Sequence, residues 1–297
     1  MNVPALEKLP VFAESWNVAF REKPMGTILE DRETPFVVIP NPFRYWAADP
    51  FVIRFEGKTC IFAELYDYIR RRGVLGYCEI SGGKAGKWKP VIREDYHLSY
   101  PCLMESGGKL YLMPESGEGE VLTVYEAVRF PDQWEKRVLR TAVKFADTTP
   151  VSCPGHHLAL THRVDDPEHP RLTLIDLEGK LDDRAIDGRQ PLRSRPAGHC
   201  FEKDGQSIRP GQISLDIGGG YGKGLVFCQW TLDENLCYRE REIRELYPEE
   251  LSFDKRLFLD GMHTYNGNDQ YEVIDIKTRR FNILNFAMRI VGKILRS

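Results

Sequence analysis

Acidic side chains recur in this 297-residue chain at positions where they could act in acid–base chemistry. Asp49 directly precedes a proline, Glu64 and Glu115 each lie 14 residues after a proline, and Asp147 lies three residues before one. Carboxylates that share a partly dry site raise one another's pKa, which can leave an ionised base beside a protonated acid. Cleavage of a glycosidic bond requires such a pair, so these four residues are candidate catalytic groups.

Other polar and aromatic residues could complete such a site. His263 is a further candidate for proton transfer. Arg209 could hold a carboxylate or phosphate through its two parallel N–H groups. Aromatic rings could form an apolar platform for a sugar ring. Each of these types also has an ordinary structural use, in an ion pair, a turn or the core. The predicted substrate-binding residues are Trp46, Tyr100, Arg209, Gln212 and Tyr221.

Two further patterns resemble a phosphate-binding loop and a zinc site but lack the required residues, so we predict no cofactor and no metal. The segment 218–224 is rich in glycine, but Ile217 stands where a phosphate-binding loop needs glycine, and no Ser or Thr follows Lys223. We interpret it as a hairpin at the rim of the site. His156, His157 and His162 lack the spacing of a zinc-binding helix.

The elements that must position these residues repeat about every fifty residues. Four prolines at 50, 101, 150 and 196 are separated by 51, 49 and 46 residues. Each begins an apolar run, a tight turn and a second apolar run, which is typical of a β-hairpin. A weaker fifth copy spans 261–275, and further apolar or charged-aromatic stretches supply a third and a fourth strand.

This pattern predicts an all-β fold, a five-bladed β-propeller with four-stranded blades. We expect the segment 16–20 to complete the last blade and close the ring, hiding a sheet edge. Residues 1–282 then form a single domain. Residues 283–297 form a basic amphipathic tail, expected to be a short helix packed on the propeller or lying on a membrane surface or a partner.

The propeller geometry gathers the candidate residues. Neighbouring strands of a blade are antiparallel, so the start of the first strand and the end of the second lie at the same mouth of the central channel. We therefore expect Asp49, Glu64, Glu115, Asp147 and Asp275 to meet at one mouth.

Composition and charge argue against several classes of protein. Hydrophobic residues make up 42% and charged residues 29%, an ordinary globular mix, with a net charge of -3. No long basic run indicates nucleic-acid binding, and we interpret residues 70–72, three arginines, as a solvated hairpin tip. No run of 18 apolar residues predicts a membrane span. Seven cysteines without a C-x-x-C pair and an N-terminus without signal-peptide features lead us to expect a cytoplasmic protein.

Four motifs carry a family resemblance: the segments 48–51, 99–116, 209–212 and 261–264, which include Ala48-Asp49-Pro50 and Met262-His263-Thr264. Together they resemble the N-terminal region of plant glucosamine inositolphosphorylceramide transferases and their stand-alone bacterial relatives, from about Trp16 to Asn282. That region is similar to the five-bladed furanosidase-type glycoside hydrolases.

The resemblance implies roles for particular residues. In the glycoside hydrolase clan, an Asp of the first blade is the base or nucleophile, a second Asp tunes pKa and a Glu is the acid. These roles carry over to Asp49 and Asp147. The acid of the clan usually opens a first strand, where this chain has Tyr100, Thr149 and Ala197, so Glu115, Glu64 and His263 all stand as candidate acids. The resemblance favours an inverting mechanism.

Three functional hypotheses follow. The first is glycosyl hydrolysis or transfer at the carboxylate-lined mouth. The second is a non-catalytic glycan- or glycolipid-binding module that assists polysaccharide or glycolipid synthesis. The third is a propeller that binds another protein, which a flat, apolar mouth would favour. A carbohydrate or glycolipid is the expected partner, and the sequence leaves the oligomeric state open.

Overall fold

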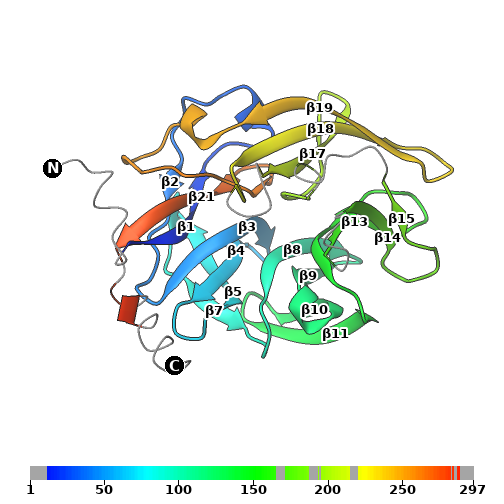
Figure 1. The fold of residues 1–297 in the computed structure, drawn as a ribbon, viewed down its shortest axis with the longest axis horizontal. Coiled ribbons are helices and arrows are strands. Elements are labelled where there is room, and N and C mark those ends of the chain that lie inside the picture. Colours follow the sequence, from blue (N-terminus) through cyan, green and yellow to red (C-terminus); the bar gives the residue numbers. More distant parts are fainter. Residues whose placement is uncertain are drawn as a thin grey trace.

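The structure is a computed structural model that describes residues 12–164, 171–186, 193, 195–214, 220–281, 283 and 286–287. The strands form five sheets around a central channel, which confirms the predicted five-bladed propeller (Figure 1). The sheets are antiparallel, so each short turn returns the chain to its own blade. Among the described residues, no helix is long and apolar enough to cross a membrane.

The first three blades follow one another along the chain. Blade I contains β3 (Tyr45–Phe55), β4 (Lys58–Asp67), β5 (Arg72–Ser81), β6 (Lys84–Ala85) and β7 (Lys89–Ile92). Blade II contains β8 (Ser99–Ser106), β9 (Lys109–Glu115), β10 (Val121–Arg129) and β11 (Gln133–Thr141). Blade III contains β12 (Phe145–Val151), β13 (Leu158–Arg163), β14 (Arg171–Asp176) and β15 (Arg184–Ala185).

The last two blades complete the ring. Blade IV contains β16 (Phe201–Lys203), β17 (Gln206–Ile213), β18 (Gly224–Leu232) and β19 (Tyr238–Leu246). Blade V contains β20 (Tyr265–Gly267), β21 (Glu272–Phe281), β1 (Phe12–Arg21) and β2 (Val37–Val38). Short 3-10 helices, η1 (Thr27–Leu29), η2 (Gly117–Gly119) and η4 (Pro248–Glu250), lie in the connections.

The N-terminal strand closes the ring, as the sequence predicts. β1 pairs with β21 along its full length, from Phe12 opposite Phe281 to Arg21 opposite Glu272. A second early strand, β2, pairs with the outer side of β1. The closure is sealed by buried groups, because Arg21 donates to Glu272 over 2.7 Å and both side chains are almost fully enclosed.

The hydrophobic core lies between neighbouring blades. One cluster joins Val18 and Phe20 of blade V to Val52 and Ile61 of blade I, and similar clusters join the next pairs. All seven cysteines are free thiols, and four of them are buried, where a thiol packs as a small apolar group. The expected C-terminal helix falls on 283–297, which lies outside the described residues except for Ile283, Phe286 and Ala287.

Each of the first three blades has a β-bulge at the same place. The pairing slips between Ala48 and Phe51, between Ser99 and Cys102, and between Ala146 and Thr149. The first unpaired residue of each bulge has a left-handed backbone, with φ 53° at Asp49, 46° at Tyr100 and 51° at Asp147. The third copy of the repeat is therefore set by Asp147 and Thr148, and Pro150 lies two residues beyond the structural equivalent of Pro50 and Pro101.

Candidate functional site

The channel mouth contains a cluster of three titratable residues. Nδ1 of His263 lies 2.6 Å from Oδ2 of Asp275 and 3.6 Å from Oδ1 of Asp49. Asp275 also accepts hydrogen bonds from the backbone N–H groups of His263 and Asp49, at 2.9 and 3.0 Å. The Thr264 hydroxyl donates to Asp49 over 2.7 Å. This cluster ties blade V to blade I at the bulge of β3.

Burial and charge shift the titration of two members of this cluster. Burial raises the pKa of Asp49 to about 6, although the adjacent His263 ring favours the ionised carboxylate. Burial alone would lower the pKa of His263, but Asp275 and Asp49 raise it to about 9. At neutral pH His263 is therefore an imidazolium, and the Asp49 carboxyl titrates close to neutrality.

A second cluster of polar side chains surrounds Asp147. Arg195 donates to Asp147 through Nε and to Glu115 through Nη2, the latter over 2.9 Å. Nε2 of Gln212 donates to Asp147 over 2.8 Å. Burial raises the pKa of the Asp147 carboxyl, and Arg195 opposes this rise. One arginine thus links two of the predicted catalytic carboxylates.

The remaining predicted carboxylate, Glu64, has a histidine partner. Its side chain is 4% exposed, and Oε1 lies 3.2 Å from Nε2 of His97. The backbone N–H of Gly73 donates to Nδ1 of His97 over 3.0 Å, which directs the Nε2 side of the ring at Glu64. Burial opposes protonation of His97, but the Glu64 charge raises its pKa to about 9.

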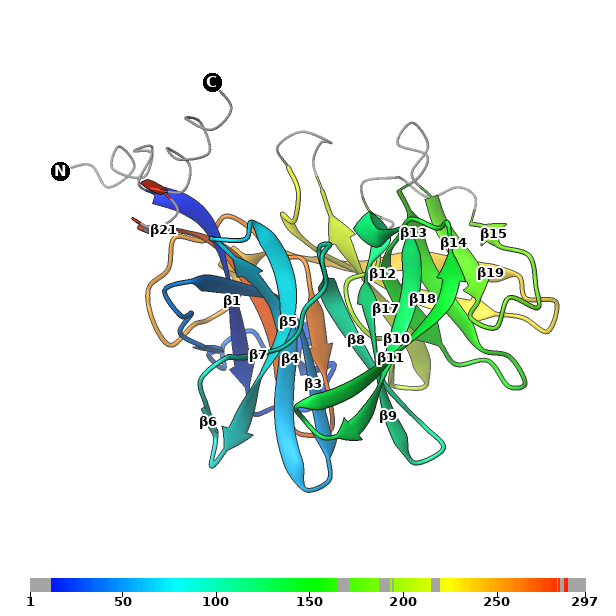
Figure 2. The same ribbon diagram turned by 90° about the horizontal axis from the view of Figure 1, so that it is seen from below.

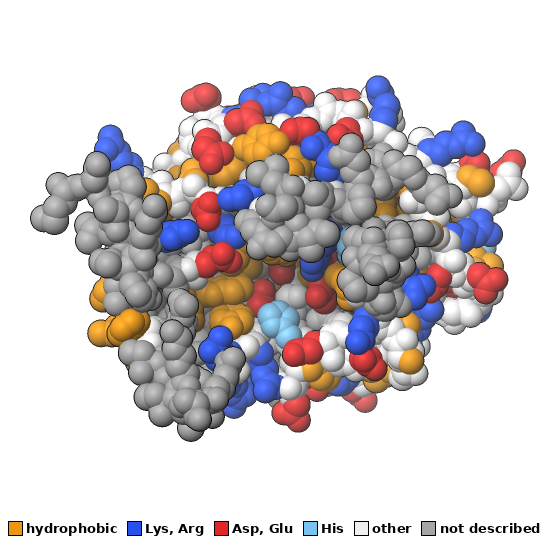
Figure 3. All heavy atoms as spheres, in the orientation of Figure 1, with side chains coloured by type: hydrophobic (Ala, Val, Ile, Leu, Met, Phe, Trp, Pro, Cys, Tyr) orange, Lys and Arg blue, Asp and Glu red, His pale blue; other side chains and the backbone are white. Residues whose placement is uncertain are grey.

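Aromatic rings stand around the same mouth. Trp46 stacks on Tyr66 where β3 begins and β4 ends, with 4.8 Å between ring centroids. Trp16 stacks on His263 at 3.9 Å, and the edge of Tyr221 meets the same imidazole at 5.2 Å. Tyr221 is 39% exposed and lies against Arg195, so its ring forms part of the accessible rim. Figure 3 views this face, where acidic, basic and histidine side chains gather at the centre.

Two predicted substrate-binding residues lie away from the accessible mouth. Tyr100 is fully buried, and its hydroxyl bonds Thr149 and accepts from the Gly198 N–H, so its ring supports the site from below. Arg209 is also fully buried and holds Glu240 of β19 through two bonds of 2.7 Å. In this structure neither side chain faces the accessible mouth, and a contact with a sugar stays a prediction for both.

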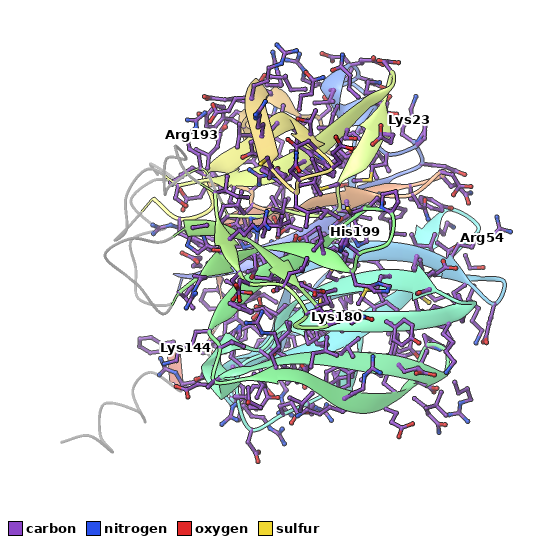
Figure 4. All side chains as sticks on the ribbon, turned by 90° about the vertical axis from the view of Figure 1, so that its right-hand side faces the viewer. Lys23, Arg54, Lys144, Lys180, Arg193 and His199 are labelled. Atoms are coloured by element: carbon purple, nitrogen blue, oxygen red, sulfur yellow. The ribbon has the colours of Figure 1, made fainter. Side chains whose placement is uncertain are left out.

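His199, labelled in Figure 4, packs beside the buried layer that contains Tyr100. The residue is partly buried, with Nε2 3.4 Å from Sγ of Cys102 and the ring edge-on to Phe51 at 5.0 Å. Burial lowers the pKa of His199 to about 4, so the ring is neutral at neutral pH.

The sequence alone does not identify Arg195 and His97 as residues of the site. Arg195 precedes the fourth proline of the repeat, but Arg209 also precedes a proline, and only the fold shows which one reaches the mouth. His97 lies in no repeated motif. His162 faces Ala146 as Glu64 faces Ala48, so it occupies the position in blade III that Glu64 has in blade I, as the repeat predicts. Burial and Arg195 lower the pKa of His162 to about 4, so it is neutral.

The cluster at Asp49 also has the residue types of a metal site. Asp49, His263 and Asp275 each offer a ligand atom, and these atoms lie within 4.8 Å of one another. The three groups already bond each other and nearby backbone N–H groups. This satisfied network accounts for the geometry without an ion.

Solved structures place the fold among propellers of carbohydrate-active enzymes. The α-L-arabinofuranosidase PaAbf62A of Podospora anserina matches with a TM-score of 0.56 and 12% identity, over 84% of this chain and 95% of that one. The GH62 α-L-arabinofuranosidase of Coprinopsis cinerea also matches with a TM-score of 0.56, at 14% identity over 88% and 97%. At these identities the likeness concerns the fold.

Sequence comparison gives a more specific resemblance than the fold does. Residues 30–166 match the family described as glucosamine inositolphosphorylceramide transferase 1, N-terminal. The enzyme of that name from Arabidopsis thaliana is 26% identical over 247 residues, 77% of this chain and 30% of the relative. That from Oryza sativa subsp. japonica is 26% identical over 204 residues, 64% and 26%. The chain therefore resembles this N-terminal region, as its motifs predict, and spans less than a third of these relatives.

Proposed function

We propose that this propeller binds the sugar part of a glycan or glycolipid at the mouth described above and hydrolyses or transfers a glycosyl unit there. The observation that carries the proposal is Asp49, a carboxyl group 6% exposed whose pKa burial raises to about 6. A perturbed carboxyl group at a polar, aromatic-lined mouth is typical of a catalytic site. The fold shared with arabinofuranosidases and the named relatives support a carbohydrate ligand.

The contacts favour particular roles. Asp49 is the general base, since it is ionised above about pH 6. Glu115 is held by Arg195, whose Nη2 donates to it over 2.9 Å. His263 is held by Asp275 at 2.6 Å. Glu64 and Glu115 each lie beside a cation, His97 and Arg195, while His263 itself carries a proton at neutral pH, so all three stay candidate acids.

Asp49→Asn tests the proposal. The full chain is first screened by thermal shift and for turnover with pentosides, hexosaminides, uronides and nucleotide sugars. With the sugar that binds, the variant should lose about 10²- to 10⁴-fold in turnover and keep its affinity, because only the base is removed. Asp204→Asn is the matched control, since Asp204 has the same left-handed backbone (φ 51°) on an exposed turn. A near-native rate in Asp49→Asn would refute the assignment.

A non-catalytic binding module is the second candidate. The observation that favours it is Arg195, which occupies both Glu115 and Asp147 and leaves these carboxylates paired. In that case a sugar stabilises the wild-type protein and Asp49→Asn equally, and neither shows turnover. A panel in which no sugar binds would refute both candidates and favour a protein-binding propeller.

A further inference from the structure

The turn between β4 and β5 combines exposed apolar and basic side chains. It comprises Tyr68–Arg71, and Ile69 at its tip is 44% exposed. Arg70 and Arg71 are exposed, and neither forms an ion pair with a carboxylate among the described residues. Phe43 is 55% exposed, and it directly precedes Arg44, whose backbone carbonyl accepts from the Tyr68 N–H over 3.1 Å. The turn thus presents an apolar side chain directly beside two cationic ones.

The turn is held rigidly from beneath. The buried Asp67 carboxylate accepts from the backbone N–H groups of Ile69 and Arg70, at 2.9 and 3.3 Å. Arg44 donates to the same carboxylate over 3.0 and 2.5 Å. Burial opposes ionisation, but the Arg44 bonds hold the pKa of Asp67 below its usual range. The exposed tip is therefore a fixed feature, and the Asp67 charge beneath it is balanced by Arg44.

The turn lies at the mouth end of the molecule. β4 runs from Glu64 at the mouth to Asp67 and so carries the tip beyond the candidate site. In Figure 2 this end of blade I projects in the same direction as the start of β1 and the end of β21. Ile283, which follows β21, is 56% exposed. Exposed apolar groups thus extend over two adjacent blades at this end.

We propose that the β4–β5 turn docks the protein on an anionic lipid surface, with Ile69 and Phe43 entering the interface and Arg70 and Arg71 contacting lipid phosphates. Arginines near a bilayer gain from the negative surface potential, and apolar side chains beside them gain from leaving water. Docking in this way turns the channel mouth toward the headgroups. The proposal does not depend on turnover at the mouth.

The charges around the turn favour lipid over a nucleic acid. A nucleic acid would use the two arginines but would offer the exposed Ile69 side chain no apolar environment. An acidic protein would need the arginines and would make little use of an exposed Ile69. A bilayer uses both features and contacts only the projecting tip.

Vesicle co-sedimentation of the full chain tests the proposal, with phosphatidylcholine vesicles that contain or lack phosphatidylserine. The wild-type protein should bind only the anionic vesicles and release them as salt rises. Arg70→Glu/Arg71→Glu should weaken binding by about a hundredfold, and Ile69→Ser by about tenfold. Lys84→Glu/Lys87→Glu is the matched control, because these exposed lysines lie at the opposite end of blade I and the charge change is equal.

Three outcomes would overturn the proposal. The wild-type protein could fail to bind anionic vesicles, the two double variants could bind equally, or Ile69→Ser could bind as the wild type does. The last result would show that charge alone holds the protein on the vesicle and that Ile69 does not enter the interface. Circular dichroism and melting curves show whether each variant is folded. Since the assay uses no sugar, a failure here leaves the proposed glycan site untouched, and a failure of that site leaves docking untouched.

Discussion

At the scale of single residues, Arg195 joins two carboxylates of the mouth. It pairs with Glu115 and with Asp147, whose side chain is 2% exposed. Arg195→Ala leaves the buried Asp147 carboxylate with Gln212 as its remaining side-chain partner. We expect the free energy of unfolding at neutral pH to fall by about 3 kcal/mol, because removing one partner of a buried pair strands the other charge. Chemical denaturation measures the change.

Arg193→Ala is the control for this prediction. Arg193 lies at the mouth end (Figure 4) and its side chain is partly buried, but its partners Glu242 and Glu245 are 38% and 43% exposed, whereas Asp147 is enclosed. Its removal should cost less than about 1 kcal/mol. Arg195→Ala/Asp147→Asn should recover part of the loss, since no buried charge then remains. A double variant no more stable than Arg195→Ala would contradict the role assigned to the pair.

His263 predicts a pH dependence of stability. Its pKa is about 9 in the folded protein and 6.5 in the reference state, so its contribution is complete below pH 6.5 and is lost as pH rises through 9. We expect wild-type stability to fall over this window by a few kcal/mol more than that of His263→Asn. His97 has a similar pKa but is present in both proteins, so the difference reports His263.

Denaturation at several pH values measures this difference, with His157→Asn as the control because His157 lies at the surface with a side chain 65% exposed. The slopes are compared rather than the absolute stabilities, since loss of the ring also removes its stacking on Trp16. Parallel curves for wild type and His263→Asn would show that the imidazolium does not stabilise the fold.

At the scale of elements, the bulges connect the strands to the site. Each places a non-glycine residue in a left-handed conformation, which costs an L-residue roughly 1–2 kcal/mol. Both Asp49→Gly and Asp49→Ala remove the carboxylate, so their difference isolates the backbone. We expect the glycine variant to be more stable by about 1 kcal/mol. Ala48→Gly, one residue earlier, should lower stability, and thermal melts compare the three. An alanine variant as stable as the glycine variant would show that the bulge is unstrained.

The same elements show what the sequence could predict. The spacing of prolines and turn glycines predicts the hairpins of the blades. The order of these blades along the chain then leaves the N-terminal strand to complete the last blade. Which arginine reaches the mouth depends on packing between blades: Arg195 bonds Asp147, 48 residues away, while Arg209 turns outward to Glu240. In blade III the bulge, rather than the proline, sets the register, and periodicity carries no signal for a one- or two-residue slip.

At the scale of the whole molecule, ring closure by β1 makes the five blades one cooperative unit. β1 lies between β21 and β2, and its side chains Trp16, Val18 and Phe20 are buried. Burial of each stabilises the fold by about 1.5–3 kcal/mol. Their sum approaches the 5–15 kcal/mol by which an entire domain is stable, and β21 without β1 would present an unpaired edge.

We therefore expect deletion of residues 1–21 to abolish the cooperative melt of the whole propeller and to cause aggregation. Phe20→Ala keeps the strand and removes one buried ring, so it should melt cooperatively at a lower temperature, with a loss of about 3–5 kcal/mol. Near-UV circular dichroism during heating distinguishes the two. A truncated chain that still melts in one sharp transition would mean that four closed blades suffice. Blade V would then be an attachment rather than the closure of the ring.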